Sequence, residues 1–164
     1  MEADPLGTAW KMHAALVEWT GKADLKASFS LTVQSVTLVL MGILTSSGRL
    51  AMGSGSGASQ ILLWAGFLLM AGGASCAAVT ISPNLRKERR GPNKNDDFLF
   101  FGHLRTWEPG ELEAVLRETD PLPALSRQLV VMSEIAWVKH RWVQWSFILA
   151  VVGAATLGVG AVVR

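Results

Sequence analysis

Three long stretches of this sequence carry no charged side chain. They are Ala27–Gly48, Leu50–Leu85 and Trp142–Val163. A helix needs about 20 apolar residues to cross the roughly 30 Å hydrocarbon core of a bilayer. The first and third stretches have about that length, and a run of glycine and serine at 53–57 shortens the second to Gln60–Ser82. The sequence therefore predicts a membrane protein with three spans.

The predicted fold class is all-α, with three transmembrane helices and a small helical subdomain in the cytosol. The 164 residues leave too little chain outside the spans for a large soluble domain. The predicted order is a cytosolic amphipathic helix at 1–27, spans at 28–47, 60–82 and 142–163, an external Gly/Ser loop at 48–59 and the cytosolic subdomain at 83–141.

The basic residues predict the orientation of the chain. Lys11, Lys22 and Lys26 precede the first span, whereas Arg49 and Arg164 stand alone in the loop and at the C-terminus. The segment between the second and third spans is by far the most basic, with Arg86, Lys87, Arg89, Arg90, Lys94, Arg105, Arg117, Arg127, Lys139 and Arg141. The positive-inside rule then places the N-terminus and 83–141 in the cytoplasm and the C-terminus outside.

Apolar periodicity predicts which helix faces pack. In the helix before the first span, we expect Trp10, Ala14, Val17 and Gly21 to form one side, because they step by three and four residues. A second, heptad-like seam predicts a cytosolic helix that continues into the third span. Its residues are Leu122, Leu125, Leu129, Met132 and Ala136. A short amphipathic helix is also predicted at 107–118, with Leu112, Val115 and Leu116 inward.

Polar and small residues inside the spans predict close contacts there. An amide exposed to lipid costs free energy, so its face should meet another helix or water. Small residues four apart let two helix backbones approach. The pattern leaves two roles open, helix packing and the lining of a pore in an assembly. The candidates for these roles are Ser30, Gln34, Thr37, Gly73, Ala154 and Gly158.

No catalytic motif is present, which predicts that the chain is not an enzyme and has no cofactor. There is no HExxH, Walker or GxSxG sequence and no cluster of cysteine and histidine at metal-binding spacing. His13, His103 and His140 lie far apart in the sequence, so no metal site is expected. The basic run at 86–90 lacks interleaved aromatic residues, and no nucleic-acid partner is expected.

Two charged segments remain to be explained. Asp24 and Lys26 lie just before the first span, where a local ion pair is the simplest interpretation. Asp96 and Asp97 precede the apolar run 98–104, in which Gly102 permits a tight turn or close approach of a ligand to the backbone. Packing alone also explains that run.

Several ordered segments resemble a known family. ADLKAS at 23–28 precedes the first span, ISP at 81–83 ends the second, FLFFGHL stands at 98–104, and RQLVVMSEIAWVKHRW at 127–142 leads into the third. This order is similar to that of the Pycsar membrane effectors of bacteria. The resemblance implies that the chain senses cyclic CMP or cyclic UMP from a partner cyclase during phage infection, and then impairs the inner membrane.

A cyclic nucleotide ligand suggests roles for particular side chains. Its phosphate needs lysine, arginine or a helix N-terminus, and its ring needs an aromatic face and a polar partner. The candidates for the phosphate are Lys26, Arg105 and Lys139. Phe100, Phe101 or Trp107 are candidates for stacking on the ring, Asp24, Asn95 or Gln128 for hydrogen bonding to it, and His103 lies in the same segment.

Together with the resemblance to this family, these observations predict a ligand-gated effector of abortive infection in the bacterial inner membrane. It would bind the cyclic pyrimidine nucleotide on its cytosolic side and then form a homo-oligomer or open. The alternative is a constitutive membrane scaffold or accessory subunit that binds a partner protein through the seam at 122–136.

Overall fold

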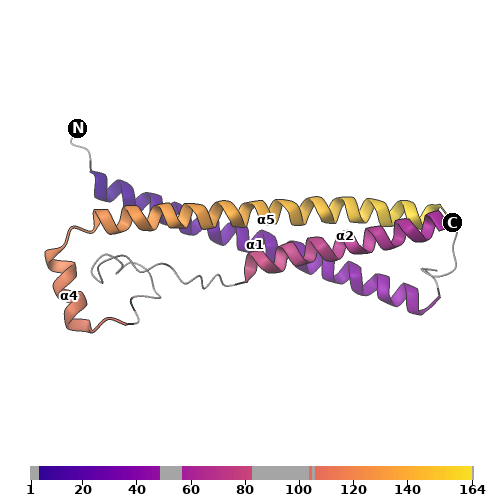
Figure 1. Ribbon diagram of the computed structural model, residues 1–164, viewed down its shortest axis with the longest axis horizontal. Helices are drawn as coiled ribbons and strands as arrows, with labels where there is room; N and C mark the ends of the chain where they lie inside the picture. Colours follow the sequence, from indigo (N-terminus) through magenta and orange to yellow (C-terminus); the bar gives the residue numbers. More distant parts are fainter. Residues whose placement is uncertain (1–3, 49–56, 83–103, 105, 164) are drawn as a thin grey trace. The chain divides into compact units, whose positions relative to one another are not determined.

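The computed structural model describes residues 4–48, 57–82, 104 and 106–163. These residues form four principal helices and no strand: α1 (Pro5–Ser46), α2 (Gly57–Ile81), α4 (Pro109–Glu118) and α5 (Leu122–Val162) (Figure 1). By length and composition, α1, α2 and α5 are able to cross a membrane. The predicted all-α class with three transmembrane helices is therefore confirmed, and the helix before the third span is continuous with it.

Local signals explain where these helices begin and end. At the start of α1 the carboxylate of Asp4 accepts a hydrogen bond from the Gly7 amide, at 2.8 Å, and Pro5 occupies the first turn. After α1, Gly48 adopts a φ of 69°, which favours glycine, and its amide donates to the Thr45 carbonyl. Asp120 accepts a hydrogen bond from the Leu122 amide at the start of α5.

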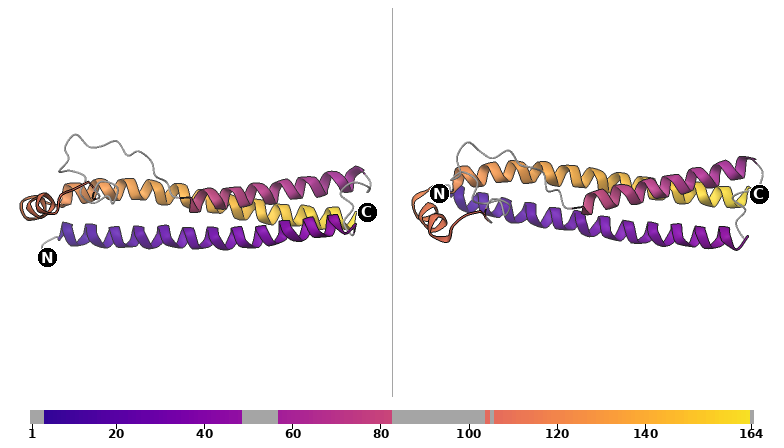
Figure 2. Two further views of the ribbon diagram at one scale, coloured as in Figure 1. Left: turned by 90° about the horizontal axis from the view of Figure 1, so that it is seen from below. Right: turned by 60° about the horizontal axis from the view of Figure 1, so that its bottom comes forward.

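The chain divides into two compact units. The first comprises 1–20 and 84–137, and the second, here called the membrane unit, comprises Gly21–Pro83 and Val138–Arg164. In the membrane unit α1 and α5 run parallel, since hydrogen bonds join Asp24 to Lys139 and Ser30 to Ser146 at sequence offsets of 115 and 116. α2 runs antiparallel to both, as Figure 2 shows.

The buried face of each span follows a heptad pattern. In α2 the buried residues are spaced alternately by four and three, and they are Ser59, Leu63, Gly66, Met70, Gly73, Ala77 and Thr80. Buried positions of α5 in the membrane unit keep the same spacing, with Val143, Ser146, Gly153, Leu157 and Gly160. A sustained heptad keeps one stripe of each helix toward its neighbours, which is the geometry of a left-handed helical bundle.

Glycines allow the three helices of the membrane unit to approach closely. A Cβ at Gly66 would lie 2.6 Å from Leu157 Cγ and 2.9 Å from the Leu157 backbone nitrogen, so an alanine does not fit without movement. A Cβ at Gly153 would lie 3.0 Å from Met70 Cγ. Since lipid tails are as apolar as leucine, close packing of this kind is a main source of cohesion between spans.

One polar contact joins α2 and α5 at the end of the membrane unit that contains the C-terminus of α5. The buried hydroxyl of Ser59 donates to the Gly160 carbonyl at 2.8 Å. We expect Ser59→Ala to lower the free energy of unfolding by about 1 kcal/mol, because a buried carbonyl loses this donor. Thermal unfolding in detergent measures it. Ser75→Ala serves as the control, since the exposed Ser75 hydroxyl has the Ala71 carbonyl of its own helix as its partner among the described residues.

The side of the helix before the first span that carries Trp10, Ala14, Val17 and Gly21 is not its buried side. Trp10, Val17 and Gly21 are exposed, whereas Ala9, Leu16 and Ala23 are buried. The buried positions recur every seven residues, in phase with Ser30 farther along α1. Small alanines fit a close seam, while the larger Trp10 at the adjacent position remains 44% exposed.

The short helix before α5 buries less of its apolar side than predicted. α4 starts at Pro109, with Glu108 as the preceding cap residue, and none of its residues is buried. Leu112 and Val115 are half-buried, and Leu116 is 57% exposed, so the expected inward burial of all three is wrong. Arg117 forms an ion pair with Glu113 on this helix, but both side chains are largely exposed and the pair adds little stability.

Candidate functional site

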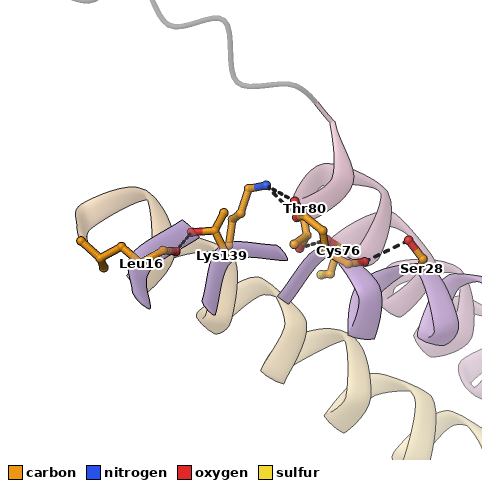
Figure 3. A network of polar contacts seen from close by, with 7 residues as sticks. Leu16, Ser28, Cys76, Thr80 and Lys139 are labelled. Carbon is orange, nitrogen blue, oxygen red and sulfur yellow. Dashed lines mark hydrogen bonds and ion pairs between the residues drawn. The ribbon is translucent and has the colours of Figure 1, made fainter. Parts of the chain in front are cut away.

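An ion pair joins α1 to α5 where the uncharged spans begin. The Lys139 ammonium donates to both carboxylate oxygens of Asp24, at 2.6 and 2.8 Å, as the dashed lines at the Lys139 nitrogen show in Figure 3. The Lys139 side chain is 18% exposed and that of Asp24 is 38% exposed. The two charges are therefore partly removed from water, and each compensates the other.

Small residues bring the two helices close enough for this pair. Ala23 and Ala27 of α1 are fully buried and pack with Ala77 of α2 and Val143 of α5. Asp24 lies within the same turn of α1, and Lys139 lies one turn before Val143 on α5. The ion pair therefore borders a layer of small apolar side chains, at the end of the three-helix bundle where the uncharged spans of α1 and α5 begin.

Nearby hydroxyl groups are engaged within their own helices. The Ser28 hydroxyl donates to the Asp24 carbonyl at 2.9 Å, and Thr80 donates to the Cys76 carbonyl at 3.0 Å (Figure 3). Thr20 likewise donates to the Leu16 carbonyl at 2.8 Å. The hydrogen-bond partners of these hydroxyls in the described residues are backbone carbonyls, so they do not replace Asp24 as the anion that balances Lys139.

The arrangement is suited to exchange of one anion for another. A phosphate diester carries one negative charge and several acceptor oxygens, as a carboxylate does, and a lysine binds either as a point charge. A phosphate at Lys139 would therefore compete with Asp24 and weaken this one of the links between α1 and α5. Within the described residues no group of histidine, cysteine, aspartate and glutamate is placed to hold a metal ion.

The structure brings together two of the ligand candidates, Asp24 and Lys139. The expected local pair of Asp24 with Lys26 does not form; Lys26 is exposed. Residues two apart on a helix point to different sides, which explains why the neighbouring helix supplies the partner instead.

The other ligand candidates are not part of this pair. Gln128 is half-buried on α5 and Trp107 is half-buried before α4, both in the first unit. The remaining candidates lie outside the described residues, and their roles stay predictions: Asn95, Phe100, Phe101, His103 and Arg105.

A second polar group lies deeper in the membrane unit. Gln34 is fully buried, and its amide nitrogen donates to the hydroxyls of Ser30 and Ser146 at 2.7 and 3.0 Å. The same nitrogen lies 3.2 Å from the Ser30 carbonyl oxygen, and the two hydroxyls are 2.8 Å apart. We call Ser30, Gln34 and Ser146 the polar cluster. It joins α1 and α5 inside the spans, where lipid offers no hydrogen bonds.

The oxygen of the Gln34 amide has no hydrogen-bond partner in the described residues. It lies against Gly73 of α2, where a Cβ would overlap this oxygen and lie 3.0 Å from the Ser146 carbonyl. Glycine at this position therefore makes room for the amide. The sequence pointed to Gln34 and Gly73 but missed Ser146, whose signal is its heptad spacing from Val143 on the same helix.

Three other candidates for packing or pore lining lie off the buried faces. Thr37 is half-buried, and its hydroxyl donates to the Val33 carbonyl of its own helix at 2.9 Å. Ala154 and Gly158 are exposed, so the expected close-packing side of the third span does not pack within this chain. Positions four apart rotate about 40° per step away from a heptad stripe, and the buried side is instead the one that contains Gly153 and Leu157. A role between chains stays a prediction.

Comparison with known families covers nearly the whole chain. The Pycsar effector protein domain matches residues 8–164. Among curated proteins and among solved structures no match to the chain was found. The family match includes all three helices that are able to cross a membrane, together with the ion pair and the polar cluster. The chain thus belongs to the Pycsar effector family, and it is a multi-pass membrane effector of anti-phage defence.

Proposed function

We propose that this effector binds a cyclic pyrimidine nucleotide, cyclic CMP or cyclic UMP, made by a paired cyclase. Binding leads to oligomerisation or opening of the spans, and this impairs the bacterial inner membrane and stops growth. The chain acts without catalysing a reaction. The family supports this proposal, and the observation that carries it furthest is the ion pair between Asp24 and Lys139, which an anionic ligand can exchange.

The proposed orientation places this pair on the cytoplasmic side. The basic residues between the second and third spans favour a cytoplasmic location for that segment and for the N-terminus, with the C-terminus outside. A cyclase product in the cytoplasm then reaches Lys139 directly. The same orientation sets the cationic side chains Lys26 and Arg141 near the headgroups, where a charged ligand gathers.

Exchange at Lys139 changes how firmly α1 is held to α5. When the nucleotide phosphate binds Lys139, Asp24 loses its partner and moves toward water, because an unpaired carboxylate near hydrocarbon is unfavourable. α5 continues unbroken from Leu122 to Val162, so a change on its N-terminal half is transmitted to the span by a stiff helix. The ligand shifts this equilibrium only by its different affinity for the two arrangements.

Thermal stability with four cyclic nucleotides tests the ligand. We expect cyclic CMP or cyclic UMP, but neither cyclic AMP nor cyclic GMP, to raise the melting temperature of the detergent-purified protein. A ligand at a concentration 100 times its dissociation constant stabilises the folded state by about 2.7 kcal/mol, which is a readily measured shift. If none of the four changes the melting temperature of well-folded protein, the sensor function is wrong. Co-purification of a defined partner protein would then favour the scaffold alternative.

A further inference from the structure

The polar cluster is more than a packing contact between the spans. A bundle in lipid gains little from burying leucine, so hydrogen bonds and close packing hold the helices together. Ser30, Gln34 and Ser146 form the next polar link between α1 and α5 beyond the ion pair. Ser30 lies six residues farther along α1 than Asp24, about 9 Å at the rise of an α-helix.

The cluster also keeps an unfavourable group inside the bundle. The Gln34 side chain is fully buried, and its oxygen is without a hydrogen bond in the described part of the chain. An apolar residue of similar length would fill the space without that cost. Gly73 and the serine hydroxyls are fitted to the amide rather than to a leucine or methionine. The polar cluster joins the helices, but the Gln34 oxygen in it lacks a hydrogen bond. Such a contact suits an arrangement that is stable but reversible.

We propose that the polar cluster is a latch that holds the three spans in the resting arrangement and is released when the effector acts. The proposal rests on the proposed effector function. Loss of the Asp24–Lys139 pair leaves the cluster as the neighbouring polar link that resists separation of α1 from α5. Release also frees the Gln34 oxygen to accept hydrogen bonds from water or another helix. The free energy that holds the latch closed therefore sets how much ligand-binding free energy activation requires.

Three substitutions weaken the latch by different routes. Gln34→Met keeps the length of the side chain and removes its hydrogen bonds. Ser146→Ala removes the hydroxyl that joins α5 to both residues of α1, with little change in shape. Gly73→Ala introduces a Cβ that displaces the Gln34 oxygen. The adjacent Gly72→Ala is the matched control, because its Cβ meets Leu149 Cδ1 at an ordinary 3.8 Å.

The measurement is dye release from vesicles that contain the purified protein, without any nucleotide. We expect each of the three variants to release dye roughly tenfold faster than the wild type, equivalent to about 1.4 kcal/mol in the resting equilibrium. Gly72→Ala and Ser75→Ala should match the wild type. Helicity and elution from a sizing column show that each variant is folded, and Ser146→Ala is the mildest change if the others fold poorly.

The outcomes separate the latch from general packing and from the ligand. If folded Ser146→Ala and Gln34→Met stay as tight as the wild type, the latch proposal is overturned. It is equally overturned if Gly72→Ala leaks as fast as Gly73→Ala, because the bundle is then sensitive to any added methyl group. Since no nucleotide is present, these results do not depend on which ligand binds. A failure of the sensor proposal would appear in the melting experiment instead.

Discussion

We expect Lys139→Gln to weaken binding of the proposed cyclic pyrimidine nucleotide by roughly 10- to 100-fold, and Asp24→Asn to strengthen it severalfold. A hydrogen bond to a charged group contributes about 1.5–3 kcal/mol, and every 1.4 kcal/mol is tenfold in affinity. Glutamine at 139 loses the ammonium that the phosphate needs. Asparagine at 24 leaves that ammonium in place but removes the carboxylate with which the ligand competes. Titration calorimetry on the folded variants measures both effects.

The two substitutions are expected to change the affinity for the nucleotide in opposite directions, and this difference is the decisive result. If both variants weaken binding to the same extent, the pair only maintains the structure and the ligand contacts other residues. Lys11→Gln is the control for net charge, because Lys11 is an exposed lysine of α1 in the other unit. A similar loss of affinity in Lys11→Gln would show that overall charge, and not the position of Lys139, attracts the nucleotide.

Gly66→Ala will lower the free energy of unfolding by about 1–3 kcal/mol, the usual cost of overpacking a close-fitting interior. The added Cβ meets the side chain and the backbone nitrogen of Leu157, both within 2.9 Å. A backbone atom does not move aside by changing a rotamer, so α2 and α5 must separate. Thermal or denaturant unfolding in detergent measures the loss.

Gly158→Ala provides the comparison for this prediction. It makes the same chemical change inside a membrane-spanning helix, but a Cβ at 158 meets nothing within 4 Å. We expect the stability of Gly158→Ala to be equal to or slightly above that of the wild type, since alanine favours the helix over glycine. Equal destabilisation of both variants would mean that the interface between α2 and α5 is not as close as described.

The three helices that are able to cross a membrane were predictable because they depend on composition along the chain. Each uncharged stretch supplies the apolar part of a long helix, and the seam from Leu122 to Ala136 continues in α5 to Lys139 and Val143 with the same spacing. These are properties of a single helix, and length and periodicity determine them. Family membership was also accessible, because four ordered segments carried it and the domain match includes them.

The partners of the polar residues were much harder to predict. The sequence suggested Lys26 as the partner of Asp24, but the partner is Lys139, 115 residues away. The helix phase of α1 and α5 decides which side chains meet. Ser146 was missed for the same reason, although it completes the surroundings of Gln34. In the helix before the first span, the large Trp10 suggested a buried side, whereas small Ala9 occupies it.

The parallel pairing of α1 and α5 limits the kind of motion that the effector can use. Lys139 lies at a seam position of α5, among otherwise apolar or small neighbours on that stripe. A slide of α5 by one heptad, about 10 Å, would bring its seam into an equivalent register but carry this ammonium past Asp24 to the level of Leu31 in the hydrocarbon. This sliding movement of α5 along its axis is strongly disfavoured. We therefore expect activation to tilt or rotate helices that stay at nearly constant depth in the bilayer.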